Sequence, residues 1–283
     1  MENAQKLKKI SLVLCTIERT TELERFLQSL VRQSYPNFEL IIVDQNKDER
    51  LVPLTRRFQK HFPILHLRSD KGLSRARNVG LKHASGDIIA FPDDDCLYPP
   101  NLLESVARWF NEHPEWHGLT GRSVDTNGLP SSGRWDNKEG AVNRYNVWRR
   151  GISITMFLRR EVVTAVGPFD EDLGVGAGTP WGSGEETDYL IRALEAGFRI
   201  FYDPNLWVVH PNKEPTPVMA YRYALGMGRV LRKHGYPLWF LAYYSARNLG
   251  ATLLHLASGK RNRAYASWAA LWGRLNGWRR STH

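Results

Sequence analysis

The sequence is poor in cysteine and has no long uninterrupted apolar run. Its 283 residues include two cysteines, Cys15 and Cys96, which fall in or beside predicted strands. With so few cysteines we expect reduced core thiols and a cytosolic chain rather than a disulfide framework. The first ten residues (MENAQKLKKI) contain no apolar segment, so no signal peptide is expected.

The glycine motifs that bind phosphate in common nucleotide folds are missing. No GxGxxG follows the first predicted strand, and no GxxxxGK[ST] occurs anywhere. A standard dinucleotide fold and a P-loop are therefore disfavoured. Any phosphate bound here must be contacted by a metal ion and by side chains.

Acidic residues are nearly absent from the carboxyl-terminal part. From Pro211 onward twelve Lys and Arg stand against one acid, Glu214, whereas residues 1–210 hold 27 basic and 28 acidic residues. This basic part is also rich in Trp, and such a mixture favours an anionic membrane surface over a nucleic-acid partner. The alternative is a basic helix pair that packs on the rest of the chain or on a second subunit of a homo-oligomer.

Residues 238–257 are largely apolar but are interrupted by Arg247, Asn248 and His255. A charge near the middle of a membrane-spanning helix costs about 2.5–3.5 kcal/mol on insertion scales. We therefore expect helices that lie on the cytoplasmic face of the inner membrane and do not cross it.

Apolar runs alternate with helical patterns over the first hundred residues. Buried strands are predicted at 10–15, 38–43, 64–67 and 87–91, and helices at 21–33, 51–61 and 73–83. This βαβαβαβ order predicts an α/β fold with a mostly parallel sheet. Later elements are expected as helices at 102–111, 160–166 and 185–196 and strands at 152–158, 200–202 and 206–209, with 118–150 and 170–184 irregular.

Three consecutive carboxylates, Asp93, Asp94 and Asp95, follow the predicted strand at 87–91. Ligands of open α/β sheets bind outside the carboxyl ends of strands, and adjacent acids repel one another unless a cation lies among them. Oxygen ligands of this kind suit Mg²⁺ or Mn²⁺ together with substrate phosphates. A solvated acidic turn is the alternative. The earlier strands also end in polar residues, namely Thr16, Glu18, Arg19, Asp44 and Asp70.

Seven segments, in order, resemble family 2 glycosyltransferases of the GT-A fold, an inverting group that uses nucleotide-activated sugars. They are ISLVLCTIER, IIVDQN, DKGLSRARNVGL, GDIIAFPDDDCLYPPNLL, GPFDEDLGVG, GSGEETDYLIRALEAG and DPNLWVVHP. The resemblance implies a Rossmann-like sheet flanked by helices. It also implies a donor pocket made by Thr16, Glu18 and Arg19 around base and ribose, by Asp44 at the base edge, and by Asp70, Gly72, Arg75 and Asn78.

The family's DxD motif aligns imperfectly with the acid triplet. Counting back from Pro99 places the first Asp of the motif on Pro92. The resemblance then implies Asp94 as the first metal ligand, Asp93 on ribose or metal, and Asp95 as a ligand or a supporting group. His210 matches a histidine that is a further ligand in some relatives, and a loop histidine without that role is the alternative.

The family's catalytic base lies in a GED-like motif, which here reads Gly184-Glu185-Glu186-Thr187-Asp188. The resemblance implies Glu186 as the base that deprotonates the acceptor hydroxyl, with Glu185 as the second candidate. A capping box with Ser183 as N-cap and Glu186 at the third helical position is the alternative. On the acceptor side, Trp181 could stack on a sugar ring or be a packing anchor. Asp188 could orient the loop or pair with Arg192.

These observations predict a GT-A catalytic domain at 1–212, with a nucleotide-sugar half at about 8–100 and an acceptor half at 101–212, and a basic helical tail at 213–283. The expected activity is metal-dependent, inverting transfer from a nucleoside-diphosphate sugar to a saccharide or polyprenyl-linked acceptor in cell-surface polysaccharide assembly. A sugar-phosphate nucleotidyltransferase would need a GxGTR loop where this chain has CTIER, and a haloacid-dehalogenase-type phosphatase would need DxDxT. A non-catalytic sugar-nucleotide binder or membrane scaffold stays as the non-enzyme alternative.

Overall fold

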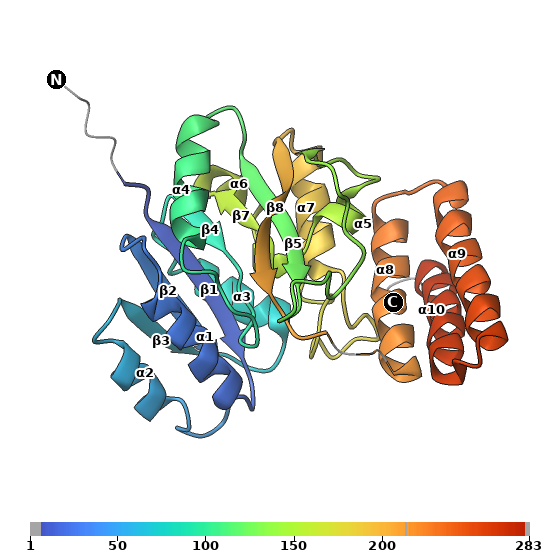
Figure 1. Ribbon diagram of the computed structural model, residues 1–283, viewed down its shortest axis with the longest axis horizontal. Coiled ribbons are helices and arrows are strands. Elements are labelled where there is room, and N and C mark those ends of the chain that lie inside the picture. Colours follow the sequence, from blue (N-terminus) through green and yellow to red (C-terminus); the bar gives the residue numbers. More distant parts are fainter. Residues whose placement is uncertain (1–6, 213, 215, 281–283) are drawn as a thin grey trace. The chain divides into compact units, whose positions relative to one another are not determined.

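The computed structural model describes residues 7–212, 214 and 216–280 (Figure 1). Residues 1–6, in the segment expected to contain no signal peptide, and residues 213, 215 and 281–283 of the tail lie outside the described residues. The chain divides into two compact units. The first contains residues 1–71, 75–169 and 189–212, and the second contains 72–74, 170–188 and 213–283. The expected domain limits at 1–212 and 213–283 stay a prediction.

The first unit is built on an eight-stranded sheet. Its strands are β1 (Ile10–Thr16), β2 (Phe38–Asp44), β3 (Ile64–Arg68), β4 (Ile88–Ala90), β5 (Gly118–Val124), β6 (Gly140–Ala141), β7 (Phe157–Arg159) and β8 (Ile200–Val209). They lie in the order β3-β2-β1-β4-β7-β5-β8-β6. The β3-β2-β1-β4 pairs and the β5-β8 pair are parallel, whereas β7 runs antiparallel to both of its neighbours and β6 to β8. The predicted mostly parallel α/β sheet is confirmed.

Helices cover both faces of this sheet. The helices are α1 (Thr21–Val31), α2 (Val52–Phe58), α3 (Leu73–Leu81), α4 (Leu102–Glu112), α5 (Val147–Arg150), α6 (Arg160–Val166) and α7 (Glu185–Glu195), with a 3₁₀ turn at Ser153–Thr155. Phe26 of α1 and Phe110 of α4 share one buried cluster with Leu12 of β1. Each such side chain stabilises the fold by about 1.5–3 kcal/mol on burial. α3 covers the other face, where a Cβ on Gly80 would lie 2.5 Å from the Val13 side chain.

The register of the strands brings their polar carboxyl ends together. Thr16 at the end of β1 is paired with Asp44 at the end of β2. Beyond β4, Asp93 forms an isolated parallel bridge with Cys15. Because parallel strands end at the same edge of a sheet, the acid triplet lies beside the loop that follows β1.

Three expectations about the second half of the sheet were wrong. Residues 118–150 are not irregular, because they contain β5, β6 and α5. The strand expected at 152–158 is a 3₁₀ turn followed by the short β7, and the two strands expected at 200–209 form the single strand β8. Polar residues within β5 and β8 weakened the apolar pattern, but their neighbours in the sheet supply the missing burial.

The second unit consists of residues 170–188 and three helices, α8 (Pro217–Lys233), α9 (Leu238–Ala257) and α10 (Arg261–Arg279). Thr216 caps α8 by accepting from Met219 N at 3.3 Å. α10 packs against both α8 and α9 (Figure 1). Among the described residues, no helix is long and apolar enough to span a membrane.

Glycines allow α8 and α10 to approach closely. A Cβ on Gly228 would lie 2.2 Å from the Arg274 carbonyl oxygen, and one on Gly277 would lie 2.1 Å from the Leu225 carbonyl oxygen. Such contacts are far inside van der Waals distance, so each position requires glycine at this helix spacing. The tail is therefore a packed helical layer whose register depends on backbone contacts.

Candidate active site

Asp94 is held by the loop that follows β1. Thr16 Oγ1 donates to Asp94 Oδ2 at 2.6 Å, and Arg19 NH1 donates to Asp94 Oδ1 at 2.6 Å. The same guanidinium lies 2.9 Å from Asp95 Oδ2. Burial raises the pKa of Asp94, and the Thr16 and Arg19 contacts only partly oppose that rise. The loop after β1 thus fixes the orientation of the triplet.

Asp93, Asp95 and His210 form the candidate metal site. One ligand atom from each lies within 4.8 Å of the others. His210, which directly follows β8, places Nε2 3.1 Å from Asp95 Oδ1, and its Nδ1 lies 2.9 Å from Ser132 Oγ and 3.0 Å from Pro211 O. Two carboxylates and an imidazole suit Mn²⁺ or Mg²⁺.

The electrostatics of this group favour the binding of a cation. Removal from water raises the pKa of Asp93 to about 6, although Arg77 and His210 oppose the rise and the neighbouring carboxylates add to it. Burial alone would lower the pKa of His210, but Asp95 and Asp93 outweigh burial and raise it. A divalent cation among these ligands would relieve the repulsion between the carboxylates.

The residues of this candidate metal site differ from the metal ligands that the motif alignment implied. Asp95 and His210 lie in the group, as that interpretation expected, and Asp93 completes it. Asp94, expected as the first ligand, instead faces Thr16 and Arg19. Its role as a metal ligand stays a prediction, and the group formed by Asp93, Asp95 and His210 does not include it.

A cavity of about 820 Å³ lies at the ends of β1, β2 and β3. It is lined by Ile17, Glu18, Gln45, Asn46, Lys47, Asp48, Glu49, Arg50, Arg68, Ser69, Asp70 and Lys71. Glu18 and Asp70 were expected in the donor pocket, whereas the four basic side chains were not anticipated. Four acidic side chains, Glu18, Asp48, Glu49 and Asp70, also line the cavity, so it offers donors for phosphate and acceptors for ribose or base. A second cavity, of about 360 Å³, reaches Asp95 between Glu22, Arg25 and Asp125.

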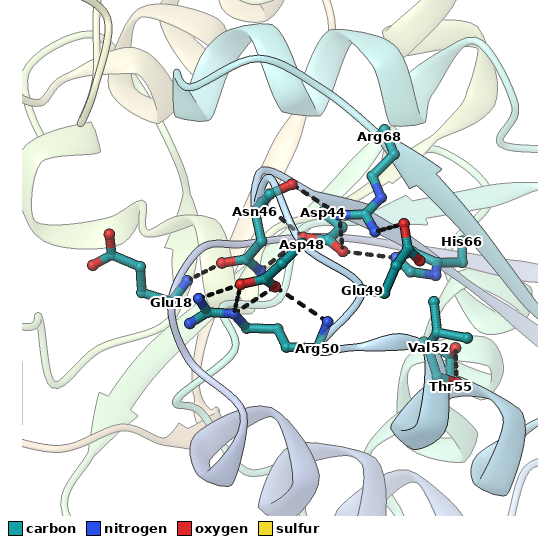
Figure 2. Close-up of polar contacts among 10 residues, drawn as sticks. All are labelled: Glu18, Asp44, Asn46, Asp48, Glu49, Arg50, Val52, Thr55, His66 and Arg68. Carbon is teal, nitrogen blue, oxygen red and sulfur yellow. Dashed lines mark hydrogen bonds and ion pairs between the residues drawn. The ribbon is translucent and has the colours of Figure 1, made fainter.

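Asp44 organises the wall of the larger cavity (Figure 2). Its carboxylate is fully buried. Oδ1 accepts from Asn46 N at 2.8 Å and from Asn46 Nδ2 at 2.7 Å, and Oδ2 lies 3.0 Å from His66 Nε2 and 2.9 Å from Arg68 NH1. These four contacts fill the acceptor capacity of a carboxylate. A contact between Asp44 and a nucleobase therefore requires one of them to be exchanged, so Asn46 and Arg68 are the more available groups.

Glu18 marks the other wall of this cavity. Its φ of 62° is a left-handed conformation, which is uncommon for residues other than glycine. The Glu18 amide donates to Asn46 Oδ1 at 2.7 Å, and in Figure 2 the Glu18 carboxylate points away from the cluster around Asp44. The Asn46 side chain thus links the loop after β1 to the loop after β2.

α3 contributes differently from the expectation. Arg75 NH1 donates to the Lys71 carbonyl oxygen at 3.1 Å. Asn78 bonds both backbone polar groups of Phe169, which gives it a structural function. The motif reading missed Arg77, which is buried with NH2 3.6 Å from Asp93 Oδ1 and its guanidinium 5.3 Å from the Phe169 ring centre. Arg77 lies three residues before Gly80, which faces the sheet, and this helical spacing is the sequence signal that could have predicted its burial.

The candidate bases lie in the second unit, at the start of α7. Glu185 is buried and Glu186 is only half-buried, so Glu186 is the more accessible carboxylate. The capping box is wrong: α7 begins at Glu185, Gly184 O accepts the first helical bond from Asp188 N at 2.8 Å, and Ser183 Oγ donates to Tyr223 O at 2.9 Å. The expected competition between capping and catalysis at Glu186 is thereby removed.

Two residues near the bases are tied to α8. Asp188 is fully buried, with Oδ1 2.7 Å from Lys233 Nζ and 2.8 Å from His234 Nε2. Trp181 is buried beneath Arg229, whose guanidinium carbon lies 4.7 Å from the ring centre. The Trp181 indole N–H has no hydrogen-bond partner among the described residues. Gly72, expected in the donor pocket, also belongs to this unit, with a φ of 139°.

The family model described as glycosyl transferase family 2 matches residues 11–167. This is more than half of the chain, and the chain therefore belongs to glycosyltransferase family 2. It is 23% identical over 260 residues to glycosyltransferase AglE of Haloferax volcanii, covering 88% of this chain and 80% of that protein. It is 27% identical over 285 residues to the succinoglycan biosynthesis protein ExoM of Rhizobium meliloti, covering 90% and 87%.

Solved structures share the fold. Mannosyltransferase PcManGT from Pyrobaculum calidifontis, in complex with GDP-Man and Mn²⁺, superposes with a TM-score of 0.66 at 17% identity and covers 96% of this chain and 88% of its own. S. aureus TarS in complex with UDP-GlcNAc superposes with a TM-score of 0.62 at 17% identity and covers 94% and 90%. The GT-A-type fold expected from the sequence is confirmed.

Proposed function

We propose that this chain is a metal-dependent, inverting glycosyltransferase that moves a hexosyl or deoxyhexosyl group from a nucleoside-diphosphate sugar to a hydroxyl of a saccharide or lipid-linked acceptor. One observation carries the proposal. Asp93, Asp95 and His210 converge at the sheet edge where Thr16–Arg19 leads into a cavity of about 820 Å³ lined with both basic and acidic residues. That is the arrangement that a metal–diphosphate complex requires.

Asp93, Asp95 and His210 would hold Mn²⁺ or Mg²⁺, which when bound neutralises charge on the leaving nucleoside diphosphate. Arg19 fixes Asp94 and Asp95 through two short contacts, so it sets the geometry of the ligands. Arg68, Lys47 and Lys71 in the cavity wall would contact the phosphates or ribose. The nucleobase would lie against Asn46, which Asp44 holds in place.

Glu186 would act as the general base. Its carboxylate takes the proton of the acceptor hydroxyl, the oxygen forms a bond to the anomeric carbon, and the bond from that carbon to the diphosphate oxygen breaks. Attack from the face opposite the leaving group inverts the anomeric configuration. Glu185 is the second candidate for this role, and its burial disfavours it.

The acceptor class and the cellular setting are proposed from relatives. ExoM is named for succinoglycan biosynthesis, which supports a role in assembling a cell-surface polysaccharide. GDP-Man in PcManGT and UDP-GlcNAc in TarS support a nucleotide-sugar donor for this chain. Work on a polyprenyl-linked acceptor would place the chain at the cytoplasmic face of the inner membrane. The non-catalytic binder is less favoured, because an accessible carboxylate is retained at the start of α7.

The test is release of nucleoside diphosphate by the full-length chain from UDP-, dTDP- and GDP-sugars, with and without Mn²⁺. Asp95→Asn should abolish Mn²⁺-dependent release, whereas Asp87→Asn, an exposed acid preceding β4, should not. Glu186→Gln should lower kcat by about 10²–10⁴-fold. Loss of activity in Glu185→Gln with full activity in Glu186→Gln would reassign the base. No release from any donor, or release that Asp95→Asn leaves intact, would overturn the proposal.

A further inference from the structure

The outer side of α9 carries a continuous apolar stripe. Its members recur every three or four residues along the helix, and they are Trp239, Tyr243, Ala246, Leu249, Leu253 and Leu256. All six are exposed, with Trp239 60% and Leu253 59% accessible. The stripe, here called the α9 face, therefore lies on one side of the helix, and much of its apolar surface is exposed. Leu254 beside it is 69% exposed.

The neighbouring helix adds aromatic surface. Tyr265, Trp268 and Trp272 recur at the same spacing on α10 and are all exposed, with Trp268 and Trp272 rings 6.0 Å apart. Large contiguous apolar surfaces on a folded chain mark interaction sites. Trp and Tyr are the side chains enriched where an apolar medium meets water.

The charge around this surface has one sign. Among the described residues from 216 to 280, every Asp, Glu, Lys or Arg position is basic. Lys260, the N-cap residue of α10, and Arg261, its first residue, are exposed and lie a few residues after the exposed Leu253, Leu254 and Leu256. Arg263 is already paired with Glu214, so Lys260 and Arg261 are the basic residues next to this end of the α9 face.

We infer that the α9 face and the exposed aromatic residues of α10 dock on an anionic lipid bilayer, with Lys260 and Arg261 at the headgroups. An apolar helix face with adjacent cations is the pattern of helices that lie in the membrane interface. A second copy of the chain fits less well, because a two-fold interface would bring together two surfaces whose neighbouring charges, among the described residues 216–280, are all positive. No described helix can span a membrane, so the contact is with the surface.

This surface and the candidate base belong to the same compact unit. Lys233 and His234 of α8 bind Asp188, which lies two residues after Glu186. A Cβ on Gly226 of α8 would lie 2.1 Å from the Ser183 carbonyl oxygen, so α8 is in direct contact with the segment before α7. Docking would therefore hold the base segment at the bilayer, where a lipid-linked acceptor lies; this last step rests on the proposed function.

The test is sedimentation of the full-length chain with vesicles of phosphatidylcholine alone or with about one-third phosphatidylglycerol. The chain should bind the anionic vesicles at least about tenfold more tightly. Leu253→Glu with Leu254→Glu should lower the partition coefficient at least about tenfold, because two exposed apolar contacts are replaced by charge. Lys260→Gln with Arg261→Gln should lower it about tenfold on anionic vesicles only.

Leu129→Glu is the matched control, since Leu129 is 62% exposed and lies in the first unit; it should bind vesicles like the parent. Absence of vesicle binding by the parent, or equal binding by the Leu253/Leu254 variant, would overturn the inference. So would a dimer in sedimentation velocity that this variant converts to monomer without vesicle binding. Nucleoside diphosphate release with a water-soluble acceptor should be unchanged in the variant, so failure of docking and failure of the proposed activity are told apart.

Discussion

Replacement of Asp44 by Asn should separate a positioning role from direct contact with the nucleobase. The Asp44 carboxylate is fully buried and accepts four contacts, two from Asn46 and one each from His66 and Arg68. An Asn side chain can keep its oxygen towards Asn46, but its amide group would then face the donors of His66 and Arg68.

The magnitude follows from the contacts that are lost. Each hydrogen bond to a charged group contributes about 1.5–3 kcal/mol, and breaking a buried ion pair by removing one partner costs about 3–5 kcal/mol. Because the Arg68 side chain is 38% exposed and regains water when released, we expect the Asp44→Asn loss near the lower limit, at about 3 kcal/mol. This value should appear as a lower free energy of unfolding in urea.

Binding supplies the functional readout. Asp44→Asn should weaken nucleoside diphosphate binding by calorimetry about equally for UDP, dTDP and GDP, because it loosens Arg68, proposed to contact phosphate or ribose, and keeps the contact with Asn46. Asp87→Asn is the control, since Asp87 is exposed and is not among the residues that line the cavity. A loss of stability below about 1 kcal/mol, or a loss of affinity confined to one base, would refute this reasoning and support a direct base contact.

Three further outcomes are expected. Burial opposes ionisation of Glu39, but its lysine and serine partners outweigh burial and lower its pKa from 4.5 to about 2. Since a pKa unit is worth about 1.4 kcal/mol, the ionised carboxylate stabilises the chain by about 3 kcal/mol above pH 4.5. This stabilisation is lost as the pH falls towards 2. Glu39→Gln should flatten urea-unfolding stability over that range, and an unchanged slope would contradict the assignment. Gly277→Ala should lower the free energy of unfolding by about 1–3 kcal/mol, because its Cβ would lie 2.1 Å from an α8 carbonyl oxygen. The control Gly250→Ala, with open space around it, should be neutral or stabilising. Equal melting temperatures of the two variants would disprove the close packing. Lys233→Met removes a cationic partner of the buried Asp188, so it should lower the free energy of unfolding in urea by about 2 kcal/mol. It should also lower kcat more than it raises KM. Values equal to those of the parent would mean that the pair does not position the base segment.

The sequence by itself determined the fold class and the edge of the sheet where the chemistry lies. Continuous apolar runs such as 10–15 and 38–43, alternating with helical patterns, favour buried parallel strands, and parallel strands place their polar ends together. The order of the motifs was enough to name the family, which the match over residues 11–167 confirms. The strand at 118–124, and the continuation through 203–205 that joins the two strands expected at 200–202 and 206–209, were not predicted, because burial there comes from neighbouring strands, which a local pattern does not contain.

Only the tertiary structure decided which member of each cluster faces which partner. Adjacent residues point in different directions, so the triplet sends Asp93 and Asp95 towards His210 and Asp94 towards Arg19, a division that spacing cannot predict. The sequence did not predict a role for Arg77, because that role depends on its contact with Asp93, which only the folded chain makes. Charge and apolar content predicted that the tail lies on a membrane surface, but the exposure of the α9 face depends on how α8, α9 and α10 pack, and that is a property of the folded chain alone.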